Sequence, residues 1–242
     1  MSKFFSIELK FKRWLKAFII ILGSVWLFLF FVLRNPTFTS GDVLENPAVP
    51  EVRELRDHVK FLAEMRPNRS FENPESLDAA ARYIEERLRN YGYKVASQEF
   101  TVSGRKVRNL IVRYGDASSA KRLVVVGAHY DACEIENPGA DDNASGVAGL
   151  LELARLLELE RPSVKDPIEM VFYTLEEPPF FRGDKMGSAV HARSLKEAGV
   201  DVRYMISLEM IGYFSDEALS QKFLSPILYT LYPSTGDFIA VV

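Results

Sequence analysis

The chain has 242 residues, which suits one domain of ordinary size with appendages. Apolar residues make up 48% and charged residues 26%, so a collagen-like or broadly disordered chain is excluded. A single cysteine excludes an intramolecular disulfide framework and a cysteine-based zinc finger. Residues 1–34 hold six Lys/Arg and one Glu, whereas residues 35–242 hold 24 Lys/Arg and 32 Asp/Glu. Such an acidic body argues against nucleic-acid binding.

An uncharged apolar run, AFIIILGSVWLFLFFVL, occupies residues 17–33. As a helix it would span roughly 26 Å, close to a hydrocarbon core of about 30 Å. The basic segment 1–16 favours a cytoplasmic N-terminus, with the rest of the chain on the outer side, which is the periplasm in a bacterium. We therefore expect a single-pass membrane protein with a transmembrane signal anchor; a cleaved signal peptide or a buried core helix are the alternatives. The proline-rich residues 34–50 are expected to form a linker.

Helical periodicity and apolar runs alternate along the rest of the chain. The predicted helices cover residues 52–65, 76–88, 144–159 and 188–199, and the predicted strands cover residues 94–102, 108–114, 122–128, 168–175 and 202–208. Ser76 is expected to cap the second helix, and His58 falls on the polar side of the first. The alternation predicts an α/β sandwich around a largely parallel or mixed sheet.

Side chains that can bind metal follow three of these strands, at the point where each strand ends. They are His129 and Asp131 after residues 122–128, Glu176 and Glu177 after residues 168–175, and Glu209 after residues 202–208, with Asp141 and Asp142 opening the helix in between. Ligands of such sheets bind at the carboxyl ends of the strands, so we expect these side chains to converge. Histidine with carboxylates suits zinc, and also manganese or cobalt.

Converging carboxylates would repel one another unless a cation lay among them. Two metals about 3.5–4 Å apart could share a bridging carboxylate and activate a water. Asp131 faces the same way as His129 on an extended segment and could bond the far imidazole nitrogen. Of the adjacent Glu176 and Glu177, one could bind metal while the other acts as general base.

Each of these residues also has a non-catalytic interpretation. Asp141 and Asp142 could simply form a turn and a helix cap, and the glutamates could be solvated loop residues. The joint placement at strand ends and a helix start favours the catalytic interpretation. Serine hydrolases, nucleotide-binding proteins and HExxH peptidases find no support, because G-x-S-x-G, the phosphate-binding glycine motifs and H-E-x-x-H do not occur in the sequence.

The sequence closely resembles the M28 family of zinc metallopeptidases, the aminopeptidase-like group that also includes glutaminyl cyclases. The matching segments are GAHYD (127–131), GADDNASG (139–146), TLEE (174–177), MGS (186–188) and SLEMIGY (207–213). Their order and spacing both match, over about residues 52–242. The resemblance implies a three-layer α/β/α sandwich, with a peptidase domain over residues 51–242.

The resemblance also implies two zinc ions and a role for each matched residue. His129 would bind the first zinc with Asp131 behind it, and Asp142 would bridge both ions. Glu176 would be the general base that deprotonates the bridging water, and Glu177 would bind the second zinc. Glu209 stands where most members have an aspartate ligand to the first zinc. The implied reaction is hydrolysis of a peptide bond, usually at the free N-terminus of a peptide or protein.

Two further departures from the family pattern matter. Residues 178–185 lengthen the stretch between TLEE and MGS and would border the site. Family members have a second zinc-binding histidine well downstream of position 209, whereas no histidine follows His191, so the C-terminal part of the domain is expected to be missing. The leading hypothesis is a membrane-anchored aminopeptidase; the alternatives are a single-zinc glutaminyl cyclase-like enzyme and a non-catalytic ectodomain with a binding role.

Overall fold

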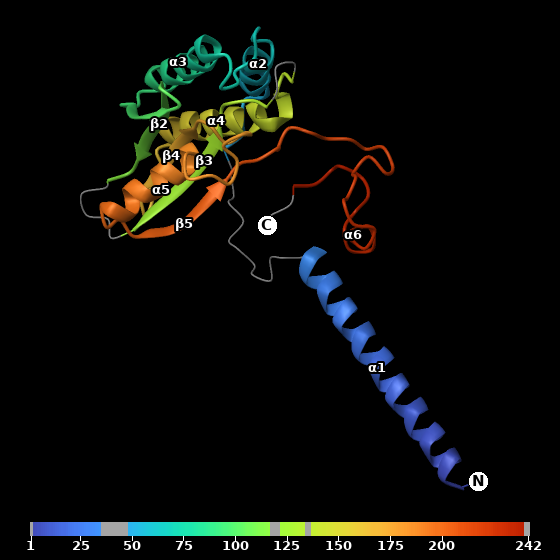
Figure 1. Ribbon diagram of the computed structural model, residues 1–242. Helices are drawn as coiled ribbons and strands as arrows, with labels where there is room; N and C mark the ends of the chain where they lie inside the picture. The colour runs from blue at the N-terminus through green and yellow to red at the C-terminus, as the bar shows by residue number, and fades with distance from the viewer. Residues whose placement is uncertain (1, 35–47, 117–121, 134–136, 240–242) are drawn as a thin grey trace. The chain divides into compact units, whose positions relative to one another are not determined.

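A computed structural model describes residues 2–34, 48–116, 122–133 and 137–239 (Figure 1). The chain forms two compact units: one is Pro47–Tyr213, and the other combines Met1–Asn46 with Phe214–Val242. Most of the predicted linker 34–50 lies outside the described residues. The assignment of residues 51–242 to one domain stays a prediction.

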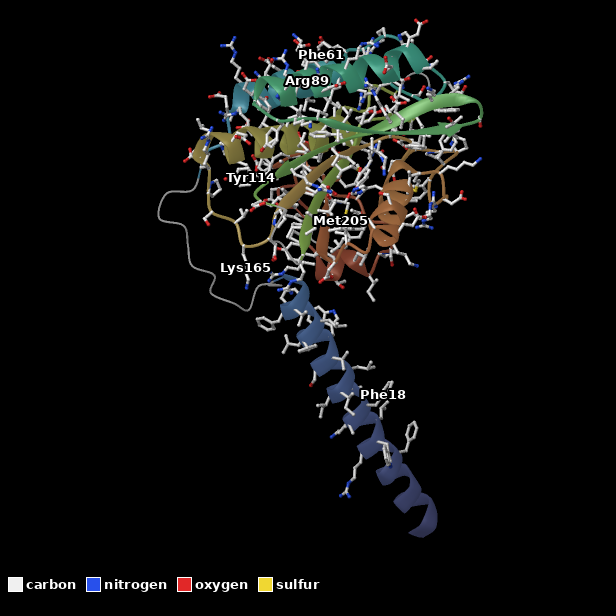
Figure 2. The ribbon with its side chains drawn as sticks, turned by 90° about the vertical axis from the view of Figure 1, so that its left-hand side faces the viewer. Phe18, Phe61, Arg89, Tyr114, Lys165 and Met205 are labelled. Carbon is white, nitrogen blue, oxygen red and sulfur yellow. The ribbon has the colours of Figure 1, made fainter. Side chains whose placement is uncertain are left out.

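The N-terminal helix α1 spans Ser2–Arg34 and contains the predicted apolar run. Its segment Phe11–Val32 is long and apolar enough to cross a membrane, and none of it is buried. Figure 2 shows its side chains, including Phe18, projecting from the helix. An anchor and a signal sequence both fit these properties. The same unit also contains the short helix α6, Leu228–Leu231.

The larger unit is built on a five-stranded sheet with the order β1-β2-β4-β3-β5. The strands are β1 Ala96–Val102, β2 Arg105–Tyr114, β3 Leu123–His129, β4 Ile168–Tyr173 and β5 Val202–Ser207. β3 runs parallel to β4 and β5, whereas β2 runs antiparallel to β1 and β4. The sheet is therefore mixed, as expected: four strands run in one direction and β2 runs against them. A tight turn at Ser103 and Gly104, both with positive φ, forces β1 and β2 into an antiparallel hairpin.

Helices cover both faces of this sheet (Figure 1). The helices α2 (Val52–Ala63), α3 (Pro74–Asn90) and α4 (Gly146–Glu160) lie on one face, and α5 (Gly187–Glu197) lies on the other. Side chains of β3 alternate between the two cores, because successive strand residues point to opposite faces. Val124 and Val126 join the core beneath α3 and α4, whereas Leu123 and Val125 pack with the α5 side. This arrangement confirms the α/β sandwich.

Two expectations for the helical layer are wrong. Ser76 does not cap α3, which begins at Pro74; its hydroxyl instead donates a hydrogen bond to the Pro67 carbonyl at 2.6 Å. His58 is buried and does not lie on a polar face. Its ring nitrogens lie 2.7 Å and 3.2 Å from the hydroxyls of Tyr83 and Tyr91, which give a buried imidazole the partners it needs.

Two leucines of α4 differ in burial, which provides a test of how this helix packs against the rest of the larger unit. Leu151 is fully buried, whereas Leu159 on the same helix is 64% exposed. We expect Leu151→Ala to lower the free energy of unfolding by about 2–5 kcal/mol, because it leaves a cavity. Leu159→Ala is expected to change it by less than about 0.5 kcal/mol. Urea unfolding of the full chain in detergent measures both free energies. Equal losses would contradict the burial of Leu151 in the core between α4 and the sheet.

Candidate active site

The site forms where β3, β4 and β5 end at the same edge of the sheet. β3 ends at His129, which is 3% exposed. The amide of Tyr130 donates to the Tyr173 carbonyl at 2.8 Å, and the amide of Leu208 donates to the Gly127 carbonyl at 2.8 Å. The loops that follow β4 and β5 therefore start directly beside His129.

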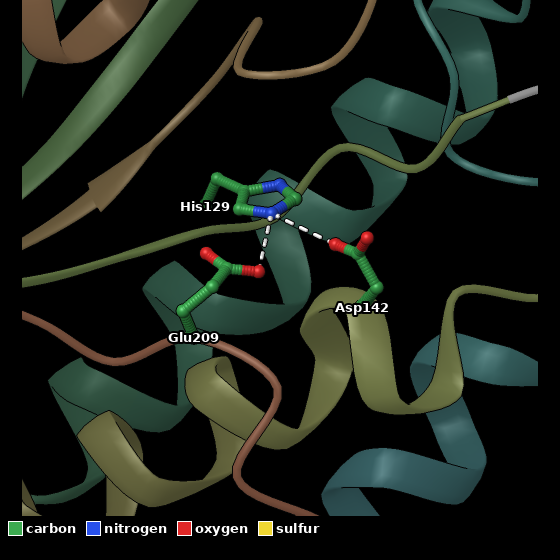
Figure 3. A group of neighbouring side chains, drawn as sticks. All are labelled: His129, Asp142 and Glu209. Carbon is green, nitrogen blue, oxygen red and sulfur yellow. Dashed lines mark hydrogen bonds and ion pairs between the residues drawn. The ribbon is translucent and has the colours of Figure 1, made fainter. Parts of the chain in front are cut away.

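Figure 3 shows His129 between two carboxylates that come from different elements. Its Nε2 atom lies 3.1 Å from Asp142 Oδ1 and 3.5 Å from Glu209 Oε1. Glu176 Oε2 lies 3.8 Å from the same nitrogen. Two groups bring one ligand atom per residue within 4.8 Å of one another: His129 with Asp142 and Glu209, and His129 with Glu176 and Glu177. The structure thus brings together the side chains that the sequence places at three strand ends and one helix start.

Asp131 connects the imidazole to the loop that carries both glutamates. Its Oδ1 atom lies 3.4 Å from His129 Nδ1, on the side of the ring away from the other carboxylates. Its two oxygens also accept the backbone amides of Glu176 and Glu177, each at 3.1 Å. Leu175 has a φ of 58°, and this left-handed residue turns both amides toward Asp131. One carboxylate therefore positions three of the side chains expected at the site.

The aspartates before α4 do not open a regular helix. The turn η1, Ala140–Ser145, is interrupted at Asp142 and Asn143, whose backbone angles are not helical. This interruption carries the Asp142 carboxylate toward His129 and leaves α4 to begin at Gly146. Asp141 points elsewhere and accepts the Gly212 amide at 2.9 Å, so it supports the loop after Glu209.

Asn143 is a structural member of the site that the sequence did not reveal. It is fully buried, and its Nδ2 donates to the Leu208 carbonyl at 2.9 Å and to Glu209 Oε2 at 3.2 Å. Its Oδ1 accepts the Gly146 amide at 3.0 Å, at the start of α4. Asn143 thus ties the loop of Glu209 to the turn of Asp142. The one signal for it in the sequence is its place in the segment GADDNASG, directly after Asp142.

The glycine of the MGS segment lets α5 start against the strand end that carries the glutamates. A Cβ atom on Gly187 would lie 2.2 Å from Asn109 Oδ1 and 2.4 Å from the Thr174 carbonyl oxygen. Asn109 is itself fully buried and accepts the Thr174 amide at 3.1 Å. The close approach of α5 to Thr174 therefore requires glycine at this position.

Negative charge dominates the electrostatics of the site. Burial opposes a charged imidazole, but the carboxylates of Asp131, Asp142 and Glu209 raise the pKa of His129 to about 12. Burial and the nearby Asp142 raise the pKa of Glu177 to about 7, and burial also raises the pKa of Glu176. These shifts are those of a carboxylate cluster that favours any added positive charge.

The residues present fit a zinc site. Zinc takes imidazole nitrogen and carboxylate oxygen ligands, and three protein ligands leave a position free for catalysis. His129, Asp142 and Glu209 supply such a set. In addition, Glu177 Oε1 is buried and has no hydrogen-bond partner among the described residues, as expected of an atom that binds a cation.

Known proteins resemble this chain over long segments. The family described as peptidase family M28 matches residues 109–231. The uncharacterised protein YfbL of Escherichia coli K12 is 43% identical over 238 residues, which is 96% of this chain and 70% of YfbL. A leucine aminopeptidase precursor from Bacteroides thetaiotaomicron superposes with a TM-score of 0.57 at 26% identity, over 73% of this chain and 67% of that one.

A glutaminyl cyclase of the same bacterium, bound to N-acetylhistamine, superposes almost equally well. Its TM-score is 0.56 at 26% identity, over 72% of this chain and 66% of the cyclase. This chain therefore spans about two thirds of the length of each of these proteins. The family match runs over half of the sequence and includes all five motif segments of the site. The chain belongs to peptidase family M28.

Proposed function

We propose that this chain is a zinc-dependent aminopeptidase that removes residues from the N-termini of peptides or proteins. The observation that carries the proposal is the convergence of His129, Asp142 and Glu209, with Glu176 beside them, at one edge of the sheet. The structural likeness to a leucine aminopeptidase precursor supports it. α1 would anchor the chain in a membrane, with its N-terminus in the cytoplasm and the larger unit on the outer side.

The metal ligands divide into two sets in this proposal. His129, Asp142 and Glu209 would hold one zinc ion, and Asp142 with Glu177 would hold the second. Bound zinc polarises a carbonyl and lowers the pKa of water near neutrality, which makes water an effective nucleophile. The acidic surroundings would also attract the ammonium group of a substrate N-terminus.

Glu176 is the general base of the proposed reaction. Its side chain lies within reach of the ligand cluster, 3.8 Å from His129 Nε2, and its backbone amide is held by Asp131. The pKa of its carboxyl is raised by burial, which brings it closer to the pH at which a base works best. Glu176 takes a proton from the attacking water and returns it to the departing amine.

The inserted residues 178–185 form the rim next to Glu177 in this proposal. The chain turns immediately, since the Phe180 amide donates to the Glu177 carbonyl at 3.0 Å. Phe180 packs edge-on against Phe71 with ring centroids 4.7 Å apart, while Phe181 is half exposed. The segment, held by Phe180 and exposing Phe181, would influence which substrate residues are accepted.

The base is tested by Glu176→Gln in the full chain, kept in detergent with zinc. We expect hydrolysis of leucine p-nitroanilide to fall at least about 100-fold, because the amide cannot accept the proton. Zinc content, measured by atomic emission, should stay unchanged. An active Glu176→Gln protein would remove Glu176 from its assigned role.

The same preparation separates the other two functions. A glutaminyl cyclase would release ammonia from peptides with N-terminal glutamine without cutting a peptide bond. The superposition on the cyclase, with a TM-score of 0.56, supports testing this alternative. A non-catalytic ectodomain would show neither activity and no tightly bound metal. Removal of the anilide activity by a chelator, and its return with zinc, is the result expected of the aminopeptidase.

The role of Asp131 is tested by Asp131→Asn. One oxygen of Asp131 accepts the Glu176 amide and the other accepts the Glu177 amide. Asparagine replaces one of these oxygens with an NH2 group, which cannot accept a hydrogen bond. We expect the affinity for zinc to fall about 10–100-fold, as is usual when a residue that orients metal ligands is changed. Calorimetric zinc titration measures it, with Asp57→Asn on the exposed face of α2 as the matched control. Equal affinity in both variants would contradict the role of Asp131.

A further inference from the structure

Arg69 is fully buried, although it lies in the loop between α2 and α3. Arginine is almost never completely buried unless it is paired. Both terminal nitrogens of Arg69 have hydrogen-bond partners, whereas its Nε has none among the described residues. The partners of Arg69 therefore indicate what the side chain does.

The guanidinium group joins the end of α2 to the segment that leads into Asp142. Its Nη1 donates to the Leu62 carbonyl at 3.0 Å, in the last turn of α2, and to the Pro138 carbonyl at 2.8 Å. Its Nη2 donates to the Gly139 carbonyl at 2.5 Å. One planar group thus holds three carbonyls, two of which precede the turn of Asp142 by only a few residues.

Gly139 passes this restraint on to the metal ligand. Its carbonyl also accepts the Ala144 amide at 3.0 Å, across the turn that contains Asp142. Its φ of 56° is the left-handed conformation that glycine tolerates, and an added Cβ would lie 2.7 Å from Arg69 Nη2 and 2.5 Å from the Asp142 carbonyl oxygen. Guanidinium, glycine and ligand backbone are therefore in direct packing contact.

The charge of Arg69 is balanced by the site. Burial lowers the pKa of Arg69 to about 10, and the charges of Asp131, Asp142 and Glu177 oppose that decrease. The side chain thus remains a cation at neutral pH. Its positive charge is close enough to these three carboxylates to interact with them.

We propose that Arg69 is a positioning residue for the metal site: by holding the carbonyls of Pro138 and Gly139 against the end of α2, it places the Asp142 carboxylate opposite His129. The inference rests on the proposed function for its consequence, which is tighter metal binding. The positioning itself is a property of the metal-free chain. Arg69 does not touch the reacting atoms.

The test compares Arg69→Lys with Arg66→Lys in the full chain in detergent. Lysine keeps the positive charge but cannot span three carbonyls with one planar group. Arg66 is the matched control, because it donates to the carbonyls of Ala63 and Met65 at the end of α2, whereas Arg69 holds the carbonyls that precede Asp142. Two quantities are measured: hydrogen exchange of residues 139–146 without metal, and zinc affinity by calorimetry.

We expect Arg69→Lys to exchange at least about tenfold faster over residues 139–146 and to bind zinc about 10–100-fold more weakly, with α3 and the sheet still protected. Arg66→Lys should leave both quantities unchanged. Wild-type values in Arg69→Lys would overturn the proposal. Loss of protection throughout α3 and the sheet would overturn it too, because Arg69 would then maintain the fold rather than the site.

Failure of the proposed function has a different result. A wild-type chain that binds no zinc would contradict the aminopeptidase, yet the exchange experiment would still decide the role of Arg69. A wild-type chain that binds zinc, with Arg69→Lys binding equally well, would leave the aminopeptidase standing and exclude Arg69 as a positioning residue.

Discussion

The parallel pairing of β3 with β4 and with β5 is the constraint on which the site depends. Because these three strands run the same way, the loops that follow them leave from one edge of the sheet. His129, Glu176 and Glu209 meet there although they are far apart in the sequence. β2 runs in the opposite direction, and none of the proposed ligands follows it.

This convergence has an electrostatic cost that the surroundings must offset. Five carboxylates lie around one imidazole, in a place where burial strengthens each repulsion. Two cationic side chains oppose them: His129 within the cluster and the buried Arg69, whose charge interacts with Asp131, Asp142 and Glu177. Zinc binds a neutral imidazole, so a bound ion would replace the charge of the His129 proton with a larger positive charge. The same carboxylates that make the metal-free site unfavourable are thus what would make the metal-bound site stable.

The sequence pointed to the proposed ligands because their signals are local. Apolar runs locate the strands, and the residue after a strand end is identified by counting, as for His129 and Glu209. The residues that hold the backbone around the proposed ligands, Asn143 and Arg69, have no such signal. Asn143 and Arg69 act through carbonyls of distant segments, and only the folded chain shows which carbonyls these are. The burial of His58 was missed for the same reason, since its partners are Tyr83 in α3 and Tyr91 directly after that helix.

The direction of β1 and β2 shows a second property of the fold that apolar patterning alone does not predict. Apolar patterning finds β1 and β2 but does not tell which way they run, whereas the Ser103–Gly104 turn between them does. Turn chemistry, read together with patterning, would have predicted the hairpin and so identified β1 and β2 as an antiparallel pair within the expected mixed sheet.

Burial divides the site into an inner and an outer half. This division explains why Asn143 and Arg69 are needed to hold the backbone of the outer half. The side chains of His129 and Asp131 are each 2% exposed, so packing against the sheet defines their positions. Those of Asp142 and Glu209 are 41% and 45% exposed, and packing alone cannot hold them. The structure restrains their backbones instead, through Asn143 for the loop of Glu209 and through Arg69 for the turn of Asp142. Because their backbones are restrained, the exposed carboxylates of Asp142 and Glu209 can keep their positions while they face both a cation and a substrate.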